Sequence, residues 1–270
     1  MIVDCHVHAG KGTRLTAPWN TRASLKNYFT RAQKAGIQRS VIFSVLDTDY
    51  AAANANIARL VRRFPNRLYG FAFVHPDHDA GRMRAMLHTA VREWGLRGIK
   101  VHGSDAMPNR LVCELARELR VPILADVISK PSVVEMMASE FPDVNFIIPH
   151  LGSFAGDWRA HQVVIDQMVR FPNVYTDTAG VQRFDYIVQA VKRAGARKVL
   201  FGSDGPWLHP ELELQKIRLL NLPPEQEALI TGGNILRLIG TAKTKTASGM
   251  PKASPAAVRA NGGRTNGGSP

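Results

Sequence analysis

The chain opens with Met1-Ile2-Val3-Asp4-Cys5-His6-Val7-His8, a short β-rich run that passes directly into polar side chains. His6 and His8 are two positions apart, so both imidazoles lie on the same face of an extended chain. In barrels of parallel strands, functional side chains gather at the carboxyl ends of the strands. This first segment therefore predicts a barrel strand that ends at a functional site.

The same arrangement recurs along the chain, because short β-rich runs alternate with longer segments of helical periodicity. The expected strands are residues 2–4, 40–45, 68–74, 98–101, 122–125, 145–148, 174–177 and 198–202. The expected helices are residues 24–35, 52–64, 81–93, 110–119, 132–141, 159–171, 185–194, 211–219 and 224–239. Eight βα units in about 240 residues predict an α/β fold of the (β/α)8 TIM-barrel type.

The composition is that of one globular domain followed by a polar tail. Of the 270 residues, 45% are hydrophobic and 21% are charged, which is sufficient for one large core. Residues 241–270 contain five Lys or Arg residues, no acidic residue, and mostly Gly, Ser, Thr, Ala, Asn and Pro. We therefore expect a barrel at residues 1–240 and a disordered basic tail at residues 241–270.

Several classes of protein are disfavoured by the sequence. No apolar run reaches the roughly 20 residues of a membrane helix, and the first residues lack the regions of a signal peptide. Cys5 and Cys113 are too far apart for a metal knuckle or a disulfide framework, so both are expected as thiols. These features favour a cytoplasmic protein without a membrane partner. The net charge of +13 suits anionic ligands, but part of it lies in the tail, and we expect no nucleic-acid partner.

Polar side chains that can bind or orient a metal follow most of the expected strands. They are His6 and His8, Lys100 and His102, Asp126, His150, Asp177 and Asp204. A His-x-His pair alone is a weak signal, but His150 and Asp204 at later strand ends make it a predicted divalent-metal site. Asp177 is expected to support the neighbouring loops through hydrogen bonds to the backbone. His88 and His161 lie within helices and are expected at the surface.

Several of these segments match a known family. They are Asp-Cys-His-Val-His at 4–8, Gly-Ile-Lys-Val-His at 98–102, Phe-Pro-Asp-Val-Asn-Phe-Ile-Ile-Pro-His-Leu-Gly at 141–152, Asn-Val-Tyr-Thr-Asp-Thr at 173–178, Leu-Phe-Gly-Ser-Asp-Gly-Pro at 200–206 and Gly-Asn at 233–234. Over residues 1 to about 240 the chain resembles the amidohydrolase superfamily, specifically the amidohydrolase-related branch (amidohydrolase 2), which includes non-oxidative decarboxylases and lactone hydrolases. The resemblance implies that His6 and His8 bind a divalent metal. It also implies that His150 is a ligand or catalytic base and that Asp204 holds the metal or its water.

The fifth expected strand departs from the family pattern. Where the family usually has a histidine after Val-Pro and three apolar residues, this chain has Asp126. Aspartate can also bind a metal, so the expected ligands are His6, His8, Asp126, His150 and Asp204. The alternative is that Asp126 orients a histidine through its free ring nitrogen. One ion is expected, with Zn²⁺ first and Mn²⁺ or Fe²⁺ as alternatives, because carboxylates make the site more tolerant of those ions.

The candidate substrate-binding residues are Lys100, His102, Trp19 and Trp207. Lys100 could meet a substrate carboxylate or the side chain of Asp126, and a structural salt bridge is the alternative. His102 could bind substrate or support the metal site. Trp19 and Trp207 follow the first and eighth strands and could wall a pocket for a flat or cyclic substrate, unless they pack on neighbouring helices.

These features together predict a metal-dependent hydrolase. A metal-activated water, losing its proton to Asp204 or His150, would cleave an amide, ester or lactone of a small cyclic or carboxylated substrate. The alternatives are non-oxidative decarboxylation of an unsaturated or aromatic acid, which uses nearly the same residues, and a catalytically silent barrel that binds a small molecule. A nuclease is disfavoured because no expected strand ends in a glutamate. The resemblance also implies a homodimer or homotetramer.

Overall fold

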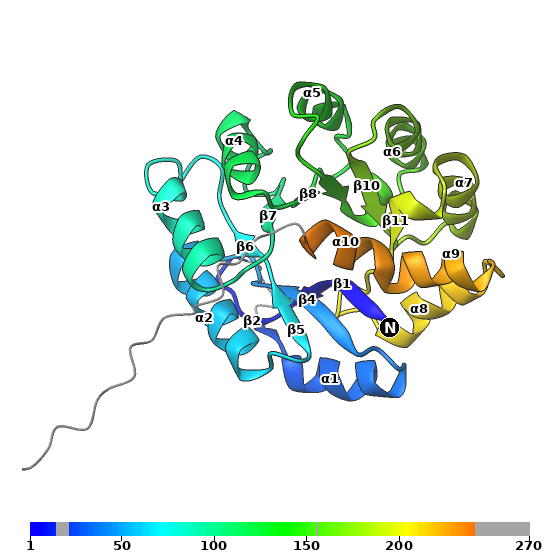
Figure 1. Cartoon of the computed structure of the whole chain (residues 1–270), viewed down its shortest axis with the longest axis horizontal. Coiled ribbons are helices and arrows are strands. Elements are labelled where there is room, and N and C mark those ends of the chain that lie inside the picture. The colour runs from blue at the N-terminus through cyan, green and yellow to red at the C-terminus, as the bar shows by residue number, and fades with distance from the viewer. Residues whose placement is uncertain (15–21, 155, 241–270) are drawn as a thin grey trace, which may run out of the picture.

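The computed structural model describes residues 1–14, 22–154 and 156–240, so Trp19 and the expected tail at 241–270 lie outside the described residues. Helices surround a central set of strands (Figure 1). The barrel strands are β1 (Val3–His8), β4 (Arg39–Phe43), β5 (Leu68–Gly70), β6 (Ala72–Phe73), β7 (Ile99–His102), β8 (Ile123–Asp126), β9 (Phe146–Ile148), β10 (Val174–Asp177) and β11 (Val199–Leu200). The short strands β2 (Gly10–Lys11) and β3 (Arg22–Ala23) pair with each other.

The helices follow the strands in the order that the sequence predicts. They are α1 (Leu25–Lys34), α2 (Tyr50–Arg63), α3 (Met83–His88), α4 (Arg110–Leu119), α5 (Ser132–Glu140), α6 (Trp158–Arg170), α7 (Phe184–Ala194), α8 (Pro210–Arg218), α9 (Pro224–Ala228) and α10 (Asn234–Gly240). A π-helical turn, η1 (Thr89–Glu93), continues α3, and another, η4 (Leu229–Gly233), joins α9 to α10. The short helical turn η2 (Pro149–Gly152) follows β9, and another, η3 (Ala196–Lys198), precedes β11.

The strands close into a ring of parallel neighbours. One sheet has the order β1-β4-β5 and the other has the order β11-β10-β9-β8-β7-β6. The third expected strand is interrupted at Phe71, whose N–H still donates to the carbonyl oxygen of Ile42 (2.9 Å) and joins the two sheets. At the opposite seam the Cys5 N–H donates to the carbonyl oxygen of Phe201 (3.0 Å), so β1 meets the eighth strand. The expected (β/α)8 barrel is confirmed.

Side chains alternate along β1 in the way that the opening motif predicts. Val3, Cys5 and Val7 are fully buried in the hydrophobic core. His6 and His8 point to the other face and line the central cavity, and both are buried. The register of β1 shifts between Asp4 and Val7, and the buried Asp4 side chain turns instead toward Tyr28 of helix α1. The strand therefore packs one face against apolar residues while its other face brings polar groups into the centre of the barrel.

Polar caps fix where several helices begin. Asp49 caps α2, Asn109 caps α4 and Asp157 caps α6. In each case the side chain accepts a hydrogen bond from a backbone N–H of the first helical turn. Such caps place each helix directly after the loop that leaves the preceding strand. Among the described residues, no helix is both long and apolar enough to cross a membrane.

Candidate metal centre

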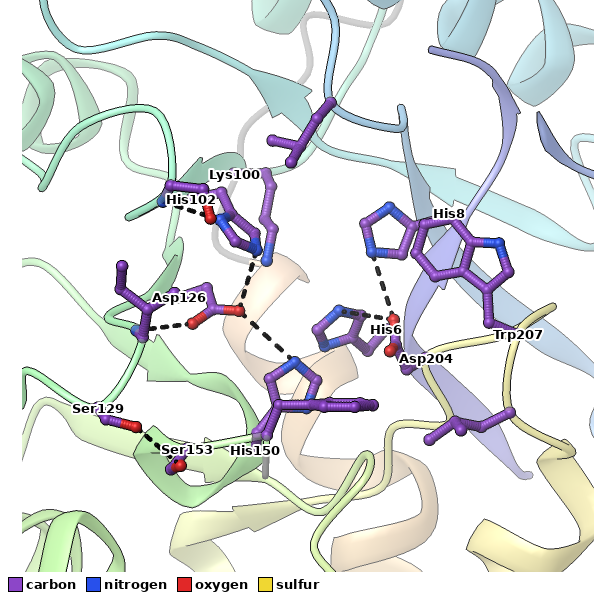
Figure 2. Close-up of a pocket in the computed structure, with 15 residues that line it drawn as sticks. His6, His8, Lys100, His102, Asp126, Ser129, His150, Ser153, Asp204 and Trp207 are labelled. Atoms are coloured by element: carbon purple, nitrogen blue, oxygen red, sulfur yellow. Dashed lines mark hydrogen bonds and ion pairs between the residues drawn. The ribbon is translucent and has the colours of Figure 1, made fainter. Parts of the chain in front are cut away.

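A cavity of about 540 Å³ lies at the carboxyl ends of the strands (Figure 2). The predicted residues that line it are His6, His8, Lys100, His102, Asp126, His150, Asp204 and Trp207. The barrel thus brings together every predicted site residue except Trp19, which lies outside the described residues. Figure 2 shows His8, Asp204 and Trp207 on one side and His102 and Asp126 on the other.

His6 and His8 present the same ring nitrogen to Asp204. The Nδ1 atom of His6 lies 2.8 Å from Asp177 Oδ2, and that of His8 lies 3.0 Å from the carbonyl oxygen of Ser44. Because these oxygens accept hydrogen bonds, each Nδ1 carries the hydrogen and each Nε2 has a free lone pair. Burial lowers the pKa of His6 to about 4, which keeps its ring neutral.

The two Nε2 atoms lie 3.5 Å (His6) and 3.3 Å (His8) from the same carboxylate oxygen, Asp204 Oδ1. Burial alone would raise the pKa of Asp204, but the polar contacts with His8, His6 and His150 outweigh it and lower this pKa to about 2. Two lone pairs therefore face an anionic oxygen, an arrangement that a cation stabilises. His6, His8 and Asp204 form a buried group of donors close enough together to hold one metal ion.

Asp4 ties the strand of the histidines to the loop of Asp204. Its carboxylate accepts hydrogen bonds from the backbone N–H groups of His6 (3.1 Å) and Ser203 (2.9 Å), and from the hydroxyls of Ser203 (2.5 Å) and Tyr28 (2.8 Å). Burial raises the pKa of Asp4 to about 7. Gly202 allows the close approach, since a Cβ there would lie 2.9 Å from the Cβ of His6. The opening motif contains Asp4, but nothing in the sequence indicates these distant partners.

His150 stands on a turn that begins where β9 ends. Its backbone N–H donates to Asp177 Oδ1 (3.0 Å), and its Nδ1 donates to the carbonyl oxygen of Ala179 (2.6 Å). Its Nε2 lone pair then faces Asp126 Oδ2 at 3.6 Å. The expected bonds of Asp177 to the backbone are present, because its Oδ1 also accepts from the Ala179 N–H (3.1 Å). Asp177 thus orients His6 with one carboxylate oxygen and His150 with the other.

The opposite wall holds His102 and Asp126. The Nδ1 of His102 accepts a hydrogen bond from the Ser104 N–H (3.1 Å), so its Nε2 carries the hydrogen toward Asp126 Oδ2, 3.3 Å away. Burial lowers the pKa of His102 to about 4. Burial alone would raise the pKa of Asp126, but His102, His150 and Lys100 together hold it well below its usual range. This wall therefore presents an anionic carboxylate beside two imidazoles.

Lys100 is the unusual member of the cavity. Its side chain is fully buried, and its Nζ has no hydrogen-bond partner within the part of the chain that the structure describes. The amine lies 5.0 Å from the centre of the Phe43 ring and points into the cavity (Figure 2). Burial lowers the pKa of Lys100, although Asp126, Asp177 and Asp204 oppose the change. The structural salt bridge that the sequence left open as an alternative for Lys100 is not formed with any of the described residues.

Aromatic and aliphatic side chains form the rest of the cavity wall. The Trp207 ring lies against the His8 ring, with 4.4 Å between their centres, and Phe154 contacts His150 at 5.1 Å. Leu46, Ile128 and Leu208 complete this apolar surface. The sequence predicts Trp207 at the rim. It gives no signal for the other apolar residues, because they lie in irregular segments after the strands.

The amidohydrolase family matches residues 3–241 of the chain. The chain belongs to the amidohydrolase family. The superfamily predicted from the strand-end motifs is therefore confirmed. No curated protein matches this amidohydrolase.

Solved structures share the fold of this amidohydrolase at low sequence identity. A TIM-barrel protein from Bordetella bronchiseptica is 18% identical, covers 89% of this chain and 99% of its own, and has a TM-score of 0.71. The 2,6-dihydroxybenzoate decarboxylase from Rhizobium is 16% identical, with coverages of 88% and 98% and a TM-score of 0.67. A dihydroxybenzoic acid decarboxylase from Polaromonas sp. JS666, solved with bound manganese, is 17% identical, with coverages of 92% and 99% and a TM-score of 0.68.

The role of Asp126 in this amidohydrolase can be tested by metal affinity. Asp126 is not in the group that His6, His8 and Asp204 form, so its direct ligation stays a prediction. We expect Asp126→Asn to weaken metal binding by about 10- to 100-fold without abolishing it, because the cavity loses an anion that faces the bound ion. Competition with a chelator measures this affinity, and Asp105→Asn, at another buried carboxylate outside the cavity lining, is the control. Complete loss of the metal in Asp126→Asn would instead make Asp126 a ligand.

Proposed function

We propose that this amidohydrolase is a divalent-metal-dependent decarboxylase of a small hydroxylated aromatic acid. The strongest support is the buried amine of Lys100, which lacks a hydrogen-bond partner among the described residues. This amine lines the same cavity as the histidine and carboxylate groups that could bind a metal. A buried charged group without a partner is costly, so Lys100 is suited to pair with an anionic group of the substrate. Hydrolysis, which the sequence favours, becomes the second candidate.

The donors of the cavity suit a divalent ion. We propose that His6, His8 and Asp204 hold it, with Asp126 and His150 facing it from the other wall. When bound, the ion would polarise a substrate oxygen and stabilise the negative charge that develops there. Zn²⁺ remains the first expected ion, and the carboxylates make Mn²⁺ and Fe²⁺ the alternatives.

The other groups of the cavity have roles that follow from their positions. Lys100 pairs with the carboxylate of the incoming acid and orients it, while Trp207 and Phe154 flank the aromatic ring. His150 Nε2 takes the proton of a substrate hydroxyl and delivers it to the ring carbon that bears the carboxylate. The Asp126 carboxylate, 3.6 Å from His150 Nε2, can accept a hydrogen bond from the proton that this nitrogen carries during the transfer.

The reaction balances without an oxidant or reductant. Once the ring carbon is protonated, the bond between this carbon and the carboxylate breaks. CO₂ leaves, the bonding electrons stay on the ring, and the substrate hydroxyl regains a proton from water. The test is CO₂ release from a panel of hydroxybenzoates by metal-loaded enzyme. Release from none of them, together with ring opening of a carboxylated lactone, would replace decarboxylation by hydrolysis.

Hydrolysis stays the second candidate because of Asp204. The low pKa of Asp204, about 2, keeps its carboxylate ionised next to His6 and His8. An ionised carboxylate at this place can accept a proton from a water molecule that attacks an ester or lactone carbonyl.

Lys100 allows a direct test of carboxylate recognition. We expect Lys100→Met to weaken the binding of 2,6-dihydroxybenzoate by about 10- to 100-fold, because the bond between a charged donor and a carboxylate is lost. Resorcinol, which has the same ring and hydroxyls but no carboxylate, should bind both proteins equally. Calorimetry on the metal-loaded proteins measures both affinities.

The matched control is Lys192→Met, on the exposed surface of α7. It should leave both affinities unchanged. If Lys100→Met lost 2,6-dihydroxybenzoate and resorcinol equally, Lys100 would shape the cavity instead of recognising the carboxylate.

A further inference from the structure

The turn that presents His150 has an uncommon backbone conformation. His150 (φ 56°, ψ 24°) and Leu151 (φ 52°, ψ 33°) are left-handed, and Gly152 follows with φ 88°. A left-handed residue with a Cβ is sterically unfavourable, so two in succession persist only where surrounding contacts hold them. The direction of the His150 ring therefore depends on what holds this turn.

Contacts from several elements hold the turn. On the side of β10, Asp177 and the Ala179 carbonyl bind the backbone and ring of His150. Beyond it, the Gly152 carbonyl accepts a hydrogen bond from the Ser129 N–H (2.9 Å). Helix α6 closes the outer side so tightly that a Cβ on Gly152 would lie 2.7 Å from Val164. The remaining carbonyl of the turn, that of Leu151, accepts its hydrogen bond from a residue of α6.

His161 is the residue of α6 that holds it. Its Nδ1 lies 3.0 Å from the carbonyl oxygen of Leu151, which makes Nδ1 the protonated nitrogen. The side chain is fully buried, and its Nε2 has no partner among the described residues. Burial lowers the pKa of His161, so the ring is neutral. The surface position expected for His161 from the sequence is wrong.

We propose that His161 is a positioning residue, which fixes the left-handed turn through the Leu151 carbonyl and thereby aims the His150 ring into the cavity. His161 does not line the cavity itself. Among the described residues, the Leu151 carbonyl is the one hydrogen-bond partner of this neutral imidazole, whose ring also packs against Tyr186 with 5.3 Å between the ring centres. An apolar side chain could fill the same space without leaving a nitrogen unpaired, so the hydrogen bond is what a histidine adds here. The inference rests on the proposed role of His150, but the position of the ring can be measured without turnover.

Three substitutions separate the hydrogen bond from the shape of the ring. In His161→Asn the amide nitrogen takes the place of Nδ1 and keeps the donor, whereas His161→Gln places its amide near Nε2. His161→Phe keeps an aromatic ring without any donor. The readout is the Nδ1–H signal of His150 in the full-length protein labelled with ¹⁵N-histidine, assigned by its absence in His150→Asn.

We expect one sharp, exchange-protected His150 signal in the natural protein and in His161→Asn. In His161→Phe and His161→Gln it should shift, broaden and exchange faster with solvent. An unchanged His150 signal in His161→Phe would overturn the proposal. Equal disturbance in all three variants, with equal losses of melting temperature, would also overturn it by making His161 a packing residue only.

Activity gives a second readout once a substrate is known. We expect His161→Phe to lower kcat by about 10- to 100-fold at unchanged KM and metal content, with recovery in His161→Asn. If no variant turns over any aromatic acid, the proposed reaction fails while the ¹⁵N measurement still decides the role of His161.

Discussion

Replacing His6 and His8 together with alanine should remove the bound metal completely and reduce turnover to background. Both Nε2 lone pairs that face Asp204 disappear in this variant, and a single carboxylate does not hold a transition-metal ion at physiological concentrations. Elemental analysis of protein purified without added metal measures the effect. We expect about one equivalent of Zn, Mn or Fe in the natural protein and none in the double variant.

The matched control replaces two histidines outside the cavity lining. His78 is exposed and His88 pairs with Glu118 on the outer surface, so His78→Ala/His88→Ala should retain the full equivalent of metal. Equal metal content in the two double variants would place the ion elsewhere and refute the proposed ligands.

Substitution of His150 tests the chemistry separately from metal binding. We expect His150→Asn to slow turnover by about 10²- to 10⁴-fold, because the side chain that transfers the proton is lost. The asparagine amide can still donate to the Ala179 carbonyl, so the turn should keep its shape. Metal content should stay near one equivalent, since His6, His8 and Asp204 are intact.

His75→Asn is the control for His150→Asn. His75 is also a buried histidine after a barrel strand, but its Nδ1 accepts hydrogen bonds from backbone N–H groups and it does not line the cavity. It should leave turnover unchanged. If His150→Asn lost the metal as completely as the double variant, His150 would be a ligand, as the family resemblance allows.

The strand ends of the barrel were predictable because parallel strands bring their carboxyl ends to one rim whatever lies between them. His6, His8, His150 and Asp204 could therefore be placed together from spacing alone. The groups that orient the histidine rings could not be predicted. They are the backbone carbonyls of Ser44 and Ala179, and every residue has such a group. Only the folded chain selects which carbonyl orients which ring.

His161 shows how periodicity and residue type can disagree. It is three and four positions before Val164 and Ile165, both fully buried, so the helical spacing places it on the inner face of α6. Its polarity instead favoured the surface, since histidines are seldom fully buried. The spacing was the better guide, because a hydrogen bond to the Leu151 carbonyl offsets the cost of burial.

Two further features were not predictable: the break of the third strand at Phe71, and the amine of Lys100 without a hydrogen-bond partner among the described residues. A continuous apolar run such as residues 68–74 indicates a buried strand but not where its pairing changes from one neighbour to the other. A lysine at a strand end predicts a charged partner. The structure shows that the Lys100 amine instead points into the cavity, where a ligand could supply that partner (Figure 2).

We propose that one divalent ion binds between β1 and the loop after β11. A crystal structure with diffraction data collected at the absorption edge of the metal found by elemental analysis would locate this ion. We predict a single anomalous peak between the Nε2 atoms of His6 and His8 and the carboxylate of Asp204. A peak between His102, Asp126 and His150, or none in protein saturated with Zn²⁺ or Mn²⁺, would contradict it.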